Sequence, residues 1–319
     1  MIYICIFAGL ILLVFIWSLI EQKIIVKKEY TINSKGNGID SEGISFVLLS
    51  DIHNTGFGKG NRSLLQKIFK VNPDFVIIAG DLITKKKPCY PGNAYNLIKD
   101  LSDRYPVYFA YGNHEQRFED LEHNRDVNGI PDNELVRSWT VFKSKLKEMG
   151  VYILDNKTIT LKYKNNTLNI TGLSLDYAYY KSRSESLNQD YITDKIGKRS
   201  REGYQILIAH NPVYFKDYIL WGADLVLSGH IHGGLVRLPF IGGIISPQVR
   251  FFPKYDAGLF EDNGRYMVVS RGLGTHSFMP RIFNPPELVV INLKAEFQLL
   301  YLFQCSRSRL HQRVYQLAK

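Results

Sequence analysis

Five short fragments of this chain carry the side chains best suited to chemistry. They hold five of its eight histidines, together with aspartate, asparagine and glutamate. The fragments are Asp51-Ile52-His53, Gly80-Asp81, Gly112-Asn113-His114-Glu115, Ala209-His210-Asn211-Pro212 and Gly229-His230-Ile231-His232-Gly233-Gly234. Carboxylate oxygen and neutral imidazole nitrogen are donors that Mn²⁺, Fe²⁺ and Zn²⁺ accept. Together the fragments supply enough donors to hold two divalent metal ions.

Each fragment lies at or just after the end of a short apolar run that is typical of a buried strand. The runs are Ile44 to Leu49, Phe75 to Ala79, Val107 to Ala110, Ile206 to Ile208 and Leu225 to Leu227. Open α/β folds place their sites at the carboxyl edge of the sheet, so we expect the donors to meet there. Because alternate residues of a strand point the same way, Asp51 and His53 are expected to hold one ion together. Asp81, with two carboxylate oxygens, can bridge a pair.

Two metal ions about 3.5–4 Å apart can share a hydroxide, neutralise phosphate oxygens and support an in-line displacement. That chemistry is hydrolysis without a covalent enzyme intermediate. A phosphate-binding loop of the Walker type is not indicated, because the glycines at Gly56, Gly58 and Gly60 lack the required Gly-Lys-Ser/Thr ending.

The ordered set Asp-x-His, Gly-Asp, Gly-Asn-His-Glu, His and Gly-His-x-His resembles the calcineurin-like metallophosphoesterase superfamily, from about Ile44 to Leu293. The resemblance implies a four-layer αββα sandwich with two metal ions. One ion would take Asp51, His53, Asp81 and His232, and the other would take Asp81, Asn113, His210 and His230. It also implies that His114 contacts the scissile phosphate and assists the leaving oxygen. Glu115 would be a supporting partner that holds an imidazole or caps the next helix.

Further fragments are similar to the bacterial, membrane-anchored branch of that superfamily. They are His210-Asn211-Pro212, Asp224 to His230, Arg271-Gly272-Leu273-Gly274 and Arg281 to Glu287. Leu235 departs from the branch, which usually has glutamine after the paired glycines, so substrate contacts there can differ. Arg271 and Arg281 are candidate substrate residues, because a guanidinium fork matches phosphate oxygens. An ion pair at the rim of the second sheet is the alternative for both.

The remaining patterns predict the scaffold. Helical spacing of apolar residues predicts helices from Asn61 to Lys70 and from Asn133 to Glu148. Strands are predicted at 151–154, 158–161, 168–171, 267–269 and 288–291, with Asn165-Asn166 as a hairpin turn. Strand and helix alternate in the first half, whereas strands are closely spaced in the second. We therefore expect an α/β fold of two stacked mixed β-sheets flanked by helices.

The chain of 319 residues divides into four predicted parts. Residues 2–20 contain no charge and have the length of a bilayer core, which predicts one N-terminal transmembrane helix as a membrane anchor. Residues 21–43 are expected to be a polar tether, 44–302 the metallophosphoesterase domain and 303–319 a basic tail. Lys23, Lys27 and Lys28 after the helix favour a cytoplasmic catalytic domain in a single-pass membrane protein. A signal anchor that exports the domain is the alternative.

Two polar segments have two interpretations each. The insertion from Ser174 to Glu202 is rich in tyrosine, lysine and arginine and is either a solvated loop or a lid over the metal site. Lys85-Lys86-Lys87 is either a surface run or part of the same mouth. His123 and His311 are expected at the surface, and His276 has no assigned role.

Taken together, the patterns predict a dinuclear metal-dependent phosphoesterase or phosphohydrolase, with Mn, Fe or Zn as the two divalent ions. Its substrate would be a phosphate ester or pyrophosphate, membrane-associated or lipid-linked. A net charge of +10 suits an anionic substrate or membrane surface but carries no signature of nucleic-acid binding. No obligate protein partner is indicated, and three cysteines give no disulfide framework. The alternative function is a catalytically weak phosphoesterase-like scaffold that acts as a membrane-bound interaction module.

Overall fold

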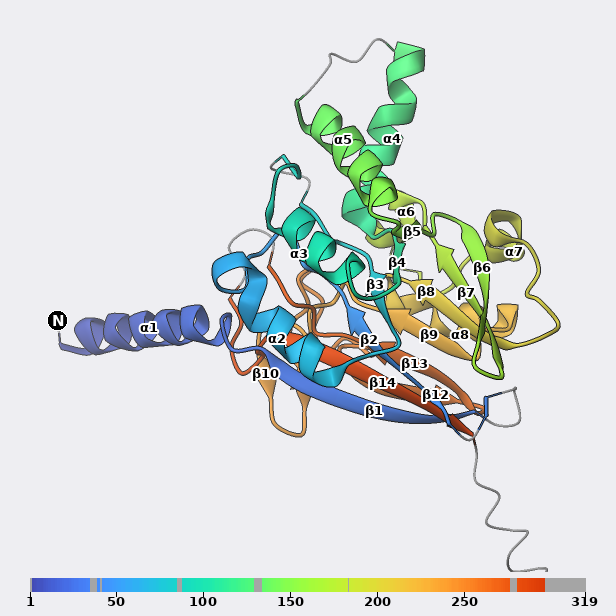
Figure 1. Ribbon diagram of the computed structural model, residues 1–319. Coiled ribbons are helices and arrows are strands. Elements are labelled where there is room, and N and C mark those ends of the chain that lie inside the picture. The colour runs from blue at the N-terminus through green and yellow to red at the C-terminus, as the bar shows by residue number, and fades with distance from the viewer. Residues whose placement is uncertain are drawn as a thin grey trace, which may run out of the picture.

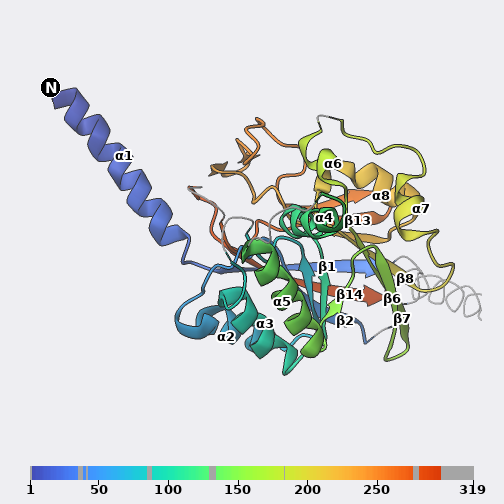
Figure 2. The same cartoon turned by 90° about the horizontal axis from the view of Figure 1, so that it is seen from above.

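A computed structural model describes residues 2–34, 39–40, 42–84, 88–128, 134–182, 184–275 and 280–295. In this part of the chain two six-stranded sheets form the body, and an N-terminal helix extends away from it (Figures 1 and 2). Both sheets are mixed, and helices lie on their outer faces. The expected α/β architecture of two stacked mixed sheets flanked by helices is confirmed.

The first sheet contains the strands of the first half of the chain and the last strand. Its order is β1 (Val26–Ser34), β14 (Glu287–Ala295), β2 (Ile44–Leu49), β3 (Phe75–Ala79), β4 (Val107–Ala110) and β5 (Tyr152–Ile153). Strands β2 to β5 are parallel, β14 runs antiparallel to β2, and β1 runs parallel to β14. The parallel set brings the carboxyl ends of β2, β3 and β4 to one edge.

The second sheet contains the strands of the second half. Its order is β12 (Gly258–Asp262), β13 (Arg265–Val269), β9 (Leu225–Ser228), β8 (Tyr204–Ala209), β7 (Asn166–Leu173) and β6 (Lys157–Tyr163). Strands β13, β9, β8 and β7 are parallel, and antiparallel β12 and β6 close the two edges. A small hairpin of β10 (Arg237–Leu238) and β11 (Gly242–Gly243) stands apart.

Three hydrophobic cores separate the layers. The first lies under α2 (Arg62–Val71), α3 (Asn93–Ser102) and α5 (Glu134–Glu148), on the outer face of the first sheet. The second fills the space between the sheets, where Phe46 and Phe75 stack on each other. The third packs α6 (Tyr177–Lys181), α7 (Tyr191–Ile196) and α8 (Phe215–Trp221) on the second sheet. The longer α4 (Asn113–Asn128) begins at the carboxyl edge of the first sheet, and η1 (Lys59–Asn61) and η2 (Pro212–Tyr214) are short 3-10 turns.

Three regions differ from their predicted structure. The tether expected at residues 21–43 is interrupted by β1, which forms a ladder with β14 over its whole length. The insertion from Ser174 to Glu202 contains α6 and α7, because scattered side chains such as Leu187 and Ile192 are buried against the second sheet. The predicted turn at Asn165-Asn166 lies one residue earlier, since β7 already begins at Asn166. The lysines at 85–87, His276, His311 and the tail from 303 to 319 lie outside the described residues, as does the side chain of His123.

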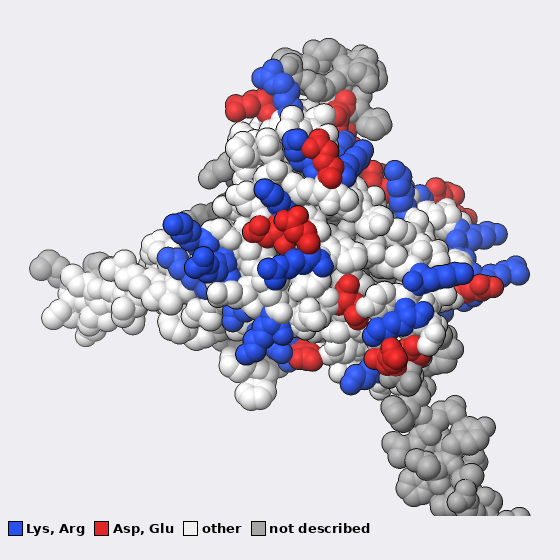
Figure 3. All heavy atoms as spheres, in the orientation of Figure 1, with Lys and Arg blue, Asp and Glu red and all other residues white. Residues whose placement is uncertain are grey.

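Among the described side chains, helix α1 (Ile2–Glu21) carries most of the exposed large hydrophobic ones, and those of α1 are between 37% and 84% exposed. Figure 3 shows it as an uncharged rod with Lys and Arg gathered on the body beside its base. Among the described residues, no helix has the length and apolar character needed to cross a bilayer. The helix predicted at residues 2–20 is therefore present, but its transmembrane character is not confirmed.

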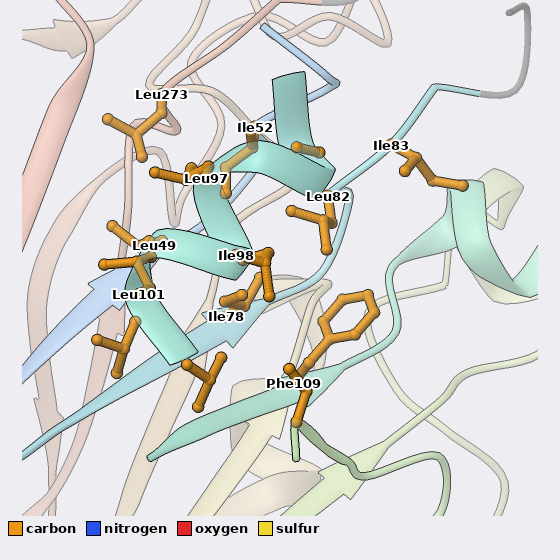
Figure 4. Close-up of a cluster of buried hydrophobic side chains, with 14 of the residues drawn as sticks. Leu49, Ile52, Ile78, Leu82, Ile83, Leu97, Ile98, Leu101, Phe109 and Leu273 are labelled. Carbon is orange, nitrogen blue, oxygen red and sulfur yellow. The ribbon is translucent and has the colours of Figure 1, made fainter. Parts of the chain in front are cut away.

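The core under α3 also fixes the loops that follow β2 and β3. Figure 4 shows Ile52 and Leu82 pointing into the same cluster as Leu97 and Ile98 of α3. Both residues are fully buried, and each is adjacent in sequence to a predicted metal ligand. Burial of a large aliphatic side chain stabilises by about 1.5–3 kcal/mol, so packing holds these loops in place from below.

Candidate metal centre

The five fragments meet at one edge of the molecule. Asp51, Asp81 and Asn113 follow β2, β3 and β4 of the first sheet, whereas His210 and His230 follow β8 and β9 of the second. Because the parallel strands of both sheets end on the same side, donors from both sheets converge, as the strand pattern predicts. Groups of donors that could hold an ion form here from buried side chains, with His230 the one half-buried member.

The Asp-x-His fragment reaches the site by a route that its strand position does not predict. Asp51 and His53 have φ values of 51° and 50°, so they are in the left-handed region and not in an extended strand. The sharp turn sends Ile52 down into the core and leaves Asp51 and His53 above it. The two side chains do come close, with His53 Nε2 4.0 Å from Asp51 Oδ1.

The first donor group consists of Asp51, His53 and His232, whose ligand atoms all lie within 4.8 Å of one another. His232 Nε2 lies 3.3 Å from Asp51 Oδ1 and 3.2 Å from His53 Nε2. His53 Nδ1 lies 3.2 Å from the carbonyl oxygen of Ile83, to which it can donate. With the proton on Nδ1, the Nε2 atom of His53 has a free lone pair directed at Asp51 and His232. Metal-binding histidines have the same arrangement.

The second donor group consists of Asp81, His210 and His230, again within 4.8 Å of one another. His210 Nδ1 lies 2.6 Å from the carbonyl oxygen of Ala79, and its Nε2 lies 3.3 Å from Asp81 Oδ2. The Asp81 carboxylate also lies near the first group, with Oδ2 3.8 Å from His53 Nε2. One carboxylate thus stands between two sets of imidazoles.

Within the predicted ligand set, two buried atoms have no hydrogen-bond partner among the described residues. They are Oδ1 of Asn113 and Nε2 of His210. A buried polar atom without a partner costs about 1–3 kcal/mol, so such atoms are rare unless an ion or a water satisfies them. The donor set contains oxygen and imidazole nitrogen and no thiolate, which fits Mn, Fe or Zn.

Glu115 holds the first-sheet loops together from behind. Its carboxylate accepts hydrogen bonds from the backbone N–H groups of Asp81 at 2.9 Å, Gly112 at 2.9 Å and Ile83 at 3.1 Å. Because this carboxylate is completely buried, it needs hydrogen-bond donors from the protein, and three backbone N–H groups supply them. The predicted supporting residue therefore fixes the loop that carries Asp81.

His114 lies beside the donor groups on the first turn of α4. Its Nε2 is 3.9 Å from Asp81 Oδ2, and its ring centroid is 4.8 Å from that of His53. Its backbone N–H donates to Asp81 Oδ1 at 3.0 Å. The imidazole is buried within reach of the space that both donor groups face.

Arg281 and Asn284 hold the Gly-His-x-His loop. The Arg281 guanidinium donates to the carbonyl oxygens of Arg271, Gly272, Gly274 and Asn284, at distances of 2.9–3.2 Å. Its Nη2 also lies 3.4 Å from His232 Nδ1. Asn284 Nδ2 donates to the carbonyl oxygens of His232 and Gly234. With only 2% of its surface exposed, Arg281 positions backbone in this structure.

Arg271 is the more accessible of the two arginines predicted for substrate binding. Its side chain is 25% exposed, and its Nε lies 3.5 Å from Glu287 Oε1. It lines an open cavity of about 440 Å³ together with Arg237, Leu238 and Phe283. That cavity is separate from the one that His230 lines.

The ionisable groups of the centre perturb one another strongly. Burial raises the pKa of Asp51 to about 6 and, with the nearby Asp81 charge, raises that of Glu115 to about 7. Burial also acts on Asp81, but the imidazoles of His114 and His210 outweigh it and hold the pKa of Asp81 well below its usual range. Burial lowers the pKa of His210, yet the Asp81 and Asp51 carboxylates raise it to about 9. A divalent cation would take the place of these shared protons.

A cavity of about 200 Å³ opens next to His230, lined by aromatic side chains and by Arg250. Gln248, which also lines this cavity, has its Nε2 3.0 Å from His230 Nε2. Tyr180 of α6 has its ring centroid 5.0 Å from that of His230, and its buried hydroxyl has no hydrogen-bond partner. No sequence motif identifies Tyr180 or Gln248, and the signal for Tyr180 is the aromatic character of the insertion that contains it.

Comparison with known proteins matches residues 44–234 to the calcineurin-like phosphoesterases. An uncharacterized metallophosphoesterase of Campylobacter jejuni is 32% identical over 79% of this chain, which spans only 60% of that protein's length. A UDP-2,3-diacylglucosamine pyrophosphatase, LpxG, of Chlamydia muridarum is 23% identical over 78% of this chain and 83% of its own. Phosphodiesterase YaeI of Escherichia coli is 23% identical over 69% of this chain and 70% of its own.

Proposed function

The chain belongs to the calcineurin-like phosphoesterase family, and from this premise we propose that it is a dinuclear metal-dependent phosphohydrolase. The family assignment makes it a hydrolase of phosphoester bonds. What we add is the number of ions, the role of each residue and the class of substrate. The proposed ligands are the seven side chains Asp51, His53, Asp81, Asn113, His210, His230 and His232.

The position of Asp81 carries the proposal of two ions. Its Oδ2 lies 3.8 Å from His53 Nε2 and 3.3 Å from His210 Nε2, which belong to different donor groups. A carboxylate with neighbours on both sides is the group that can bridge two cations. The unpartnered Oδ1 of Asn113 supports the second ion, because a neutral amide oxygen there has no other buried donor to accept from.

Bound divalent ions would supply Lewis-acid charge to the phosphoryl oxygens and lower the pKa of water. His114, whose ligand atom lies within 4.8 Å of those of His53 and Asp81, would hold a proton on Nε2 and pass it to the leaving oxygen, because it is buried at the centre and is not one of the seven proposed ligands. Tyr180 would donate its free hydroxyl proton in a hydrogen bond to a phosphoryl oxygen of the substrate. Arg271 is the candidate for contact with a further phosphate, whereas we assign Arg281 to positioning the His232 loop.

The substrate that we propose is a phosphate ester or pyrophosphate on a lipid-linked or membrane-associated molecule. The name of the chlamydial relative describes a pyrophosphatase that acts on a diacylated nucleotide sugar. A cavity next to His230 that combines Tyr179, Tyr214, Phe251 and Arg250 suits a molecule with apolar and anionic parts.

We further infer that α1 holds the enzyme at a membrane. Its apolar side chains are exposed on every face, and water-exposed apolar surface of this extent is rare in soluble proteins. Lys23, Lys27 and Lys28 follow the helix and favour a cytoplasmic body. Membrane fractionation tests this inference: the full chain should resist extraction by alkaline carbonate and be released by detergent.

The test of the catalytic proposal is manganese-dependent release of p-nitrophenol from mono- and bis-(p-nitrophenyl) phosphate. Asn113→Ala should abolish most of the turnover, while Asn96→Ala, on the exposed face of α3, should behave as wild type. Metal analysis of the purified chain should give two ions per molecule. Equal turnover by wild type and Asn113→Ala would overturn the enzyme proposal and favour the scaffold function, and a single bound ion would overturn the dinuclear one.

A further inference from the structure

Exposed apolar side chains gather in one place outside α1. Among the described residues beyond that helix, seven large hydrophobic side chains are more than half exposed, and six of them lie between positions 240 and 252 or at 283. These six, which we term the apolar rim, are Phe240, Ile241, Val249, Phe251, Phe252 and Phe283. The seventh, Leu220, lies on α8. Single exposed apolar residues are ordinary on a protein surface, but a cluster of this size marks an interaction site.

The backbone of the apolar rim is strained in a way that exposes these side chains. Phe240, Val249, Phe252 and Phe283 have φ values of 65°, 59°, 49° and 55°. Left-handed backbone is rare and energetically unfavourable for bulky or β-branched residues. Glycine would adopt the same positive φ values without strain. The chain therefore keeps large apolar side chains at positions where neither stability in water nor turn geometry requires them.

The apolar rim is continuous with the base of α1. The ring of Phe283 lies 6.5 Å from that of Trp17, and the backbone N–H of Arg281 donates to Ser18 Oγ at 2.9 Å. The segment labelled β10, which leads to Phe240 and Ile241, lies on the same side of the body as α1 in Figure 1. A membrane that binds α1 would therefore also contact the apolar rim.

The apolar rim also borders both cavities near the metal centre. Phe251 and Phe252 line the cavity that begins at His230, while Phe240 and Phe283 line the cavity of Arg271. Two basic side chains lie beside Phe251 and Phe252. Arg250 donates to the carbonyl oxygen of Ser182, and Lys254 lies over the ring of Tyr255. Arg250 and Lys254 line the same cavity as Phe251 and Phe252, where they can meet anionic lipid head groups.

We infer that the apolar rim is a membrane-contact surface that inserts its phenylalanines into the lipid interface beside α1. Apolar loop tips flanked by cations match the boundary between acyl chains and anionic head groups. The inference rests on the proposed function and deepens it: the metal centre takes a phosphate substrate that is embedded in the same bilayer and enters past Phe251 and Phe252.

The first test measures lipid contact directly in the full chain. Cys5 and Cys305 are replaced by serine, buried Cys89 is kept, and Phe240→Cys is labelled with an environment-sensitive fluorophore. Leu220→Cys is the matched control, because Leu220 is also a large apolar residue that is mostly exposed but lies outside the apolar rim. In vesicles of equal parts phosphatidylglycerol and phosphatidylethanolamine, nitroxide-labelled lipid should quench the label at 240 several-fold more than the label at 220.

Each other result of this test overturns the inference. Equal quenching at the two positions would place position 240 in water. A signal that grows with the protein-to-lipid ratio and is independent of nitroxide lipid would identify a second copy of the chain as the occupant. If the full chain does not associate with vesicles, both the membrane-contact surface and the proposed membrane role of α1 are refuted.

The second test separates this inference from the catalytic proposal. Phe240→Ser combined with Ile241→Ser should leave hydrolysis of soluble bis-(p-nitrophenyl) phosphate unchanged. It should lower hydrolysis of a long-chain alkyl p-nitrophenyl phosphate held in the same vesicles by at least about tenfold. Equal hydrolysis of the vesicle substrate by wild type and variant would refute the membrane-contact surface, whereas absence of soluble hydrolysis in the wild type would refute the phosphohydrolase itself.

Discussion

The metal centre and the apolar rim share one backbone feature: both contain several non-glycine residues with positive φ. At the metal centre five candidate ligands have positive φ, and in the apolar rim four of six residues do. The five ligands are Asp51, His53, Asp81, His230 and His232. Apart from these two sets, most positive-φ residues other than glycine are asparagines or aspartates at turns, which tolerate this conformation.

The two regions differ in what holds the strained backbone. At the metal centre the turns are buried: the backbone N–H of His230 donates to Asp51 Oδ1 at 3.1 Å, and Glu115 accepts from the N–H of Asp81. Gly229 has no room for a side chain, since a Cβ there would lie 1.8 Å from Ser50 Oγ. In the apolar rim the side chains are more than half exposed, and Phe240 is fully exposed.

This difference teaches that strain alone does not identify a site, but its surroundings indicate what the site contacts. Strained polar residues that are buried and tied by hydrogen bonds face one another, which suits a cation. Strained apolar residues that are exposed face outward, which suits a surface that the protein itself does not provide.

The largest effect is expected at Asp81, the proposed bridging ligand of the buried metal centre. Asp81→Ala removes the bridging carboxylate, so turnover of bis-(p-nitrophenyl) phosphate should fall by about a thousandfold. Metal analysis should show at most one ion per chain. Retention of two ions and of most of the turnover would show that these strained turns do not form a shared metal site.

A smaller effect is expected when the support of the buried turns is weakened. Glu115→Gln keeps the shape of the side chain but replaces one of two acceptor oxygens with an N–H₂ group, facing backbone donors. The metal concentration for half-maximal activity should rise by about 10–100-fold, with turnover at saturating metal largely retained. Titration with Mn²⁺ measures it, and an unchanged midpoint would contradict the role of Glu115 in holding Asp81.

Tyr180 lies between the two regions, beside His230 and in the cavity that Phe251 and Phe252 line. Tyr180→Phe removes only the unpartnered hydroxyl. Loss of one hydrogen bond to a charged phosphoryl group should lower turnover by about tenfold, while metal content stays at the wild-type level. If turnover is unchanged, the hydroxyl does not contact substrate and the cavity acts through its shape alone.

The smallest effect is expected in the apolar rim. Val249→Gly relieves left-handed strain of about 1–2 kcal/mol and adds about 0.5–1 kcal/mol of unfolded-state entropy. The melting temperature in detergent should therefore rise by about 1–2 °C. Asn263→Gly, at a turn where asparagine tolerates φ 52°, should leave it unchanged. A fall in the melting temperature of Val249→Gly would mean that the side chain stabilises the fold.

Much of the scaffold could be predicted because its signals are local. Runs such as Phe75 to Ala79 are short, apolar and β-rich, and a polar fragment follows each one, so strand and loop are both visible in one window of sequence. The convergence of Asp51 and His210 from different sheets follows from the parallel order of the strands. The left-handed turn at Asp51 does not, because nothing in the residue types Asp-Ile-His requires a positive φ.

The rest could not be predicted because it depends on partners far away in sequence. Strand β1 is largely polar on its exposed side, and only pairing with β14 makes it a strand. Arg281 looks like a phosphate contact until four carbonyl oxygens surround it. The apolar rim combines Phe283 with residues near 240 and 250, and no window of sequence contains all three.

The insertion of β14 between β1 and β2 has a consequence for synthesis of the protein on the ribosome. Val26 to Ser34 is made long before its ladder partner, Glu287 to Ala295. Until β14 emerges, β2 keeps one open edge and β1 has nothing to pair with. A nascent chain stalled before residue 287 would expose unpaired β1 and the open edge of β2, both of which favour aggregation, so this sheet closes only when β14 has been made.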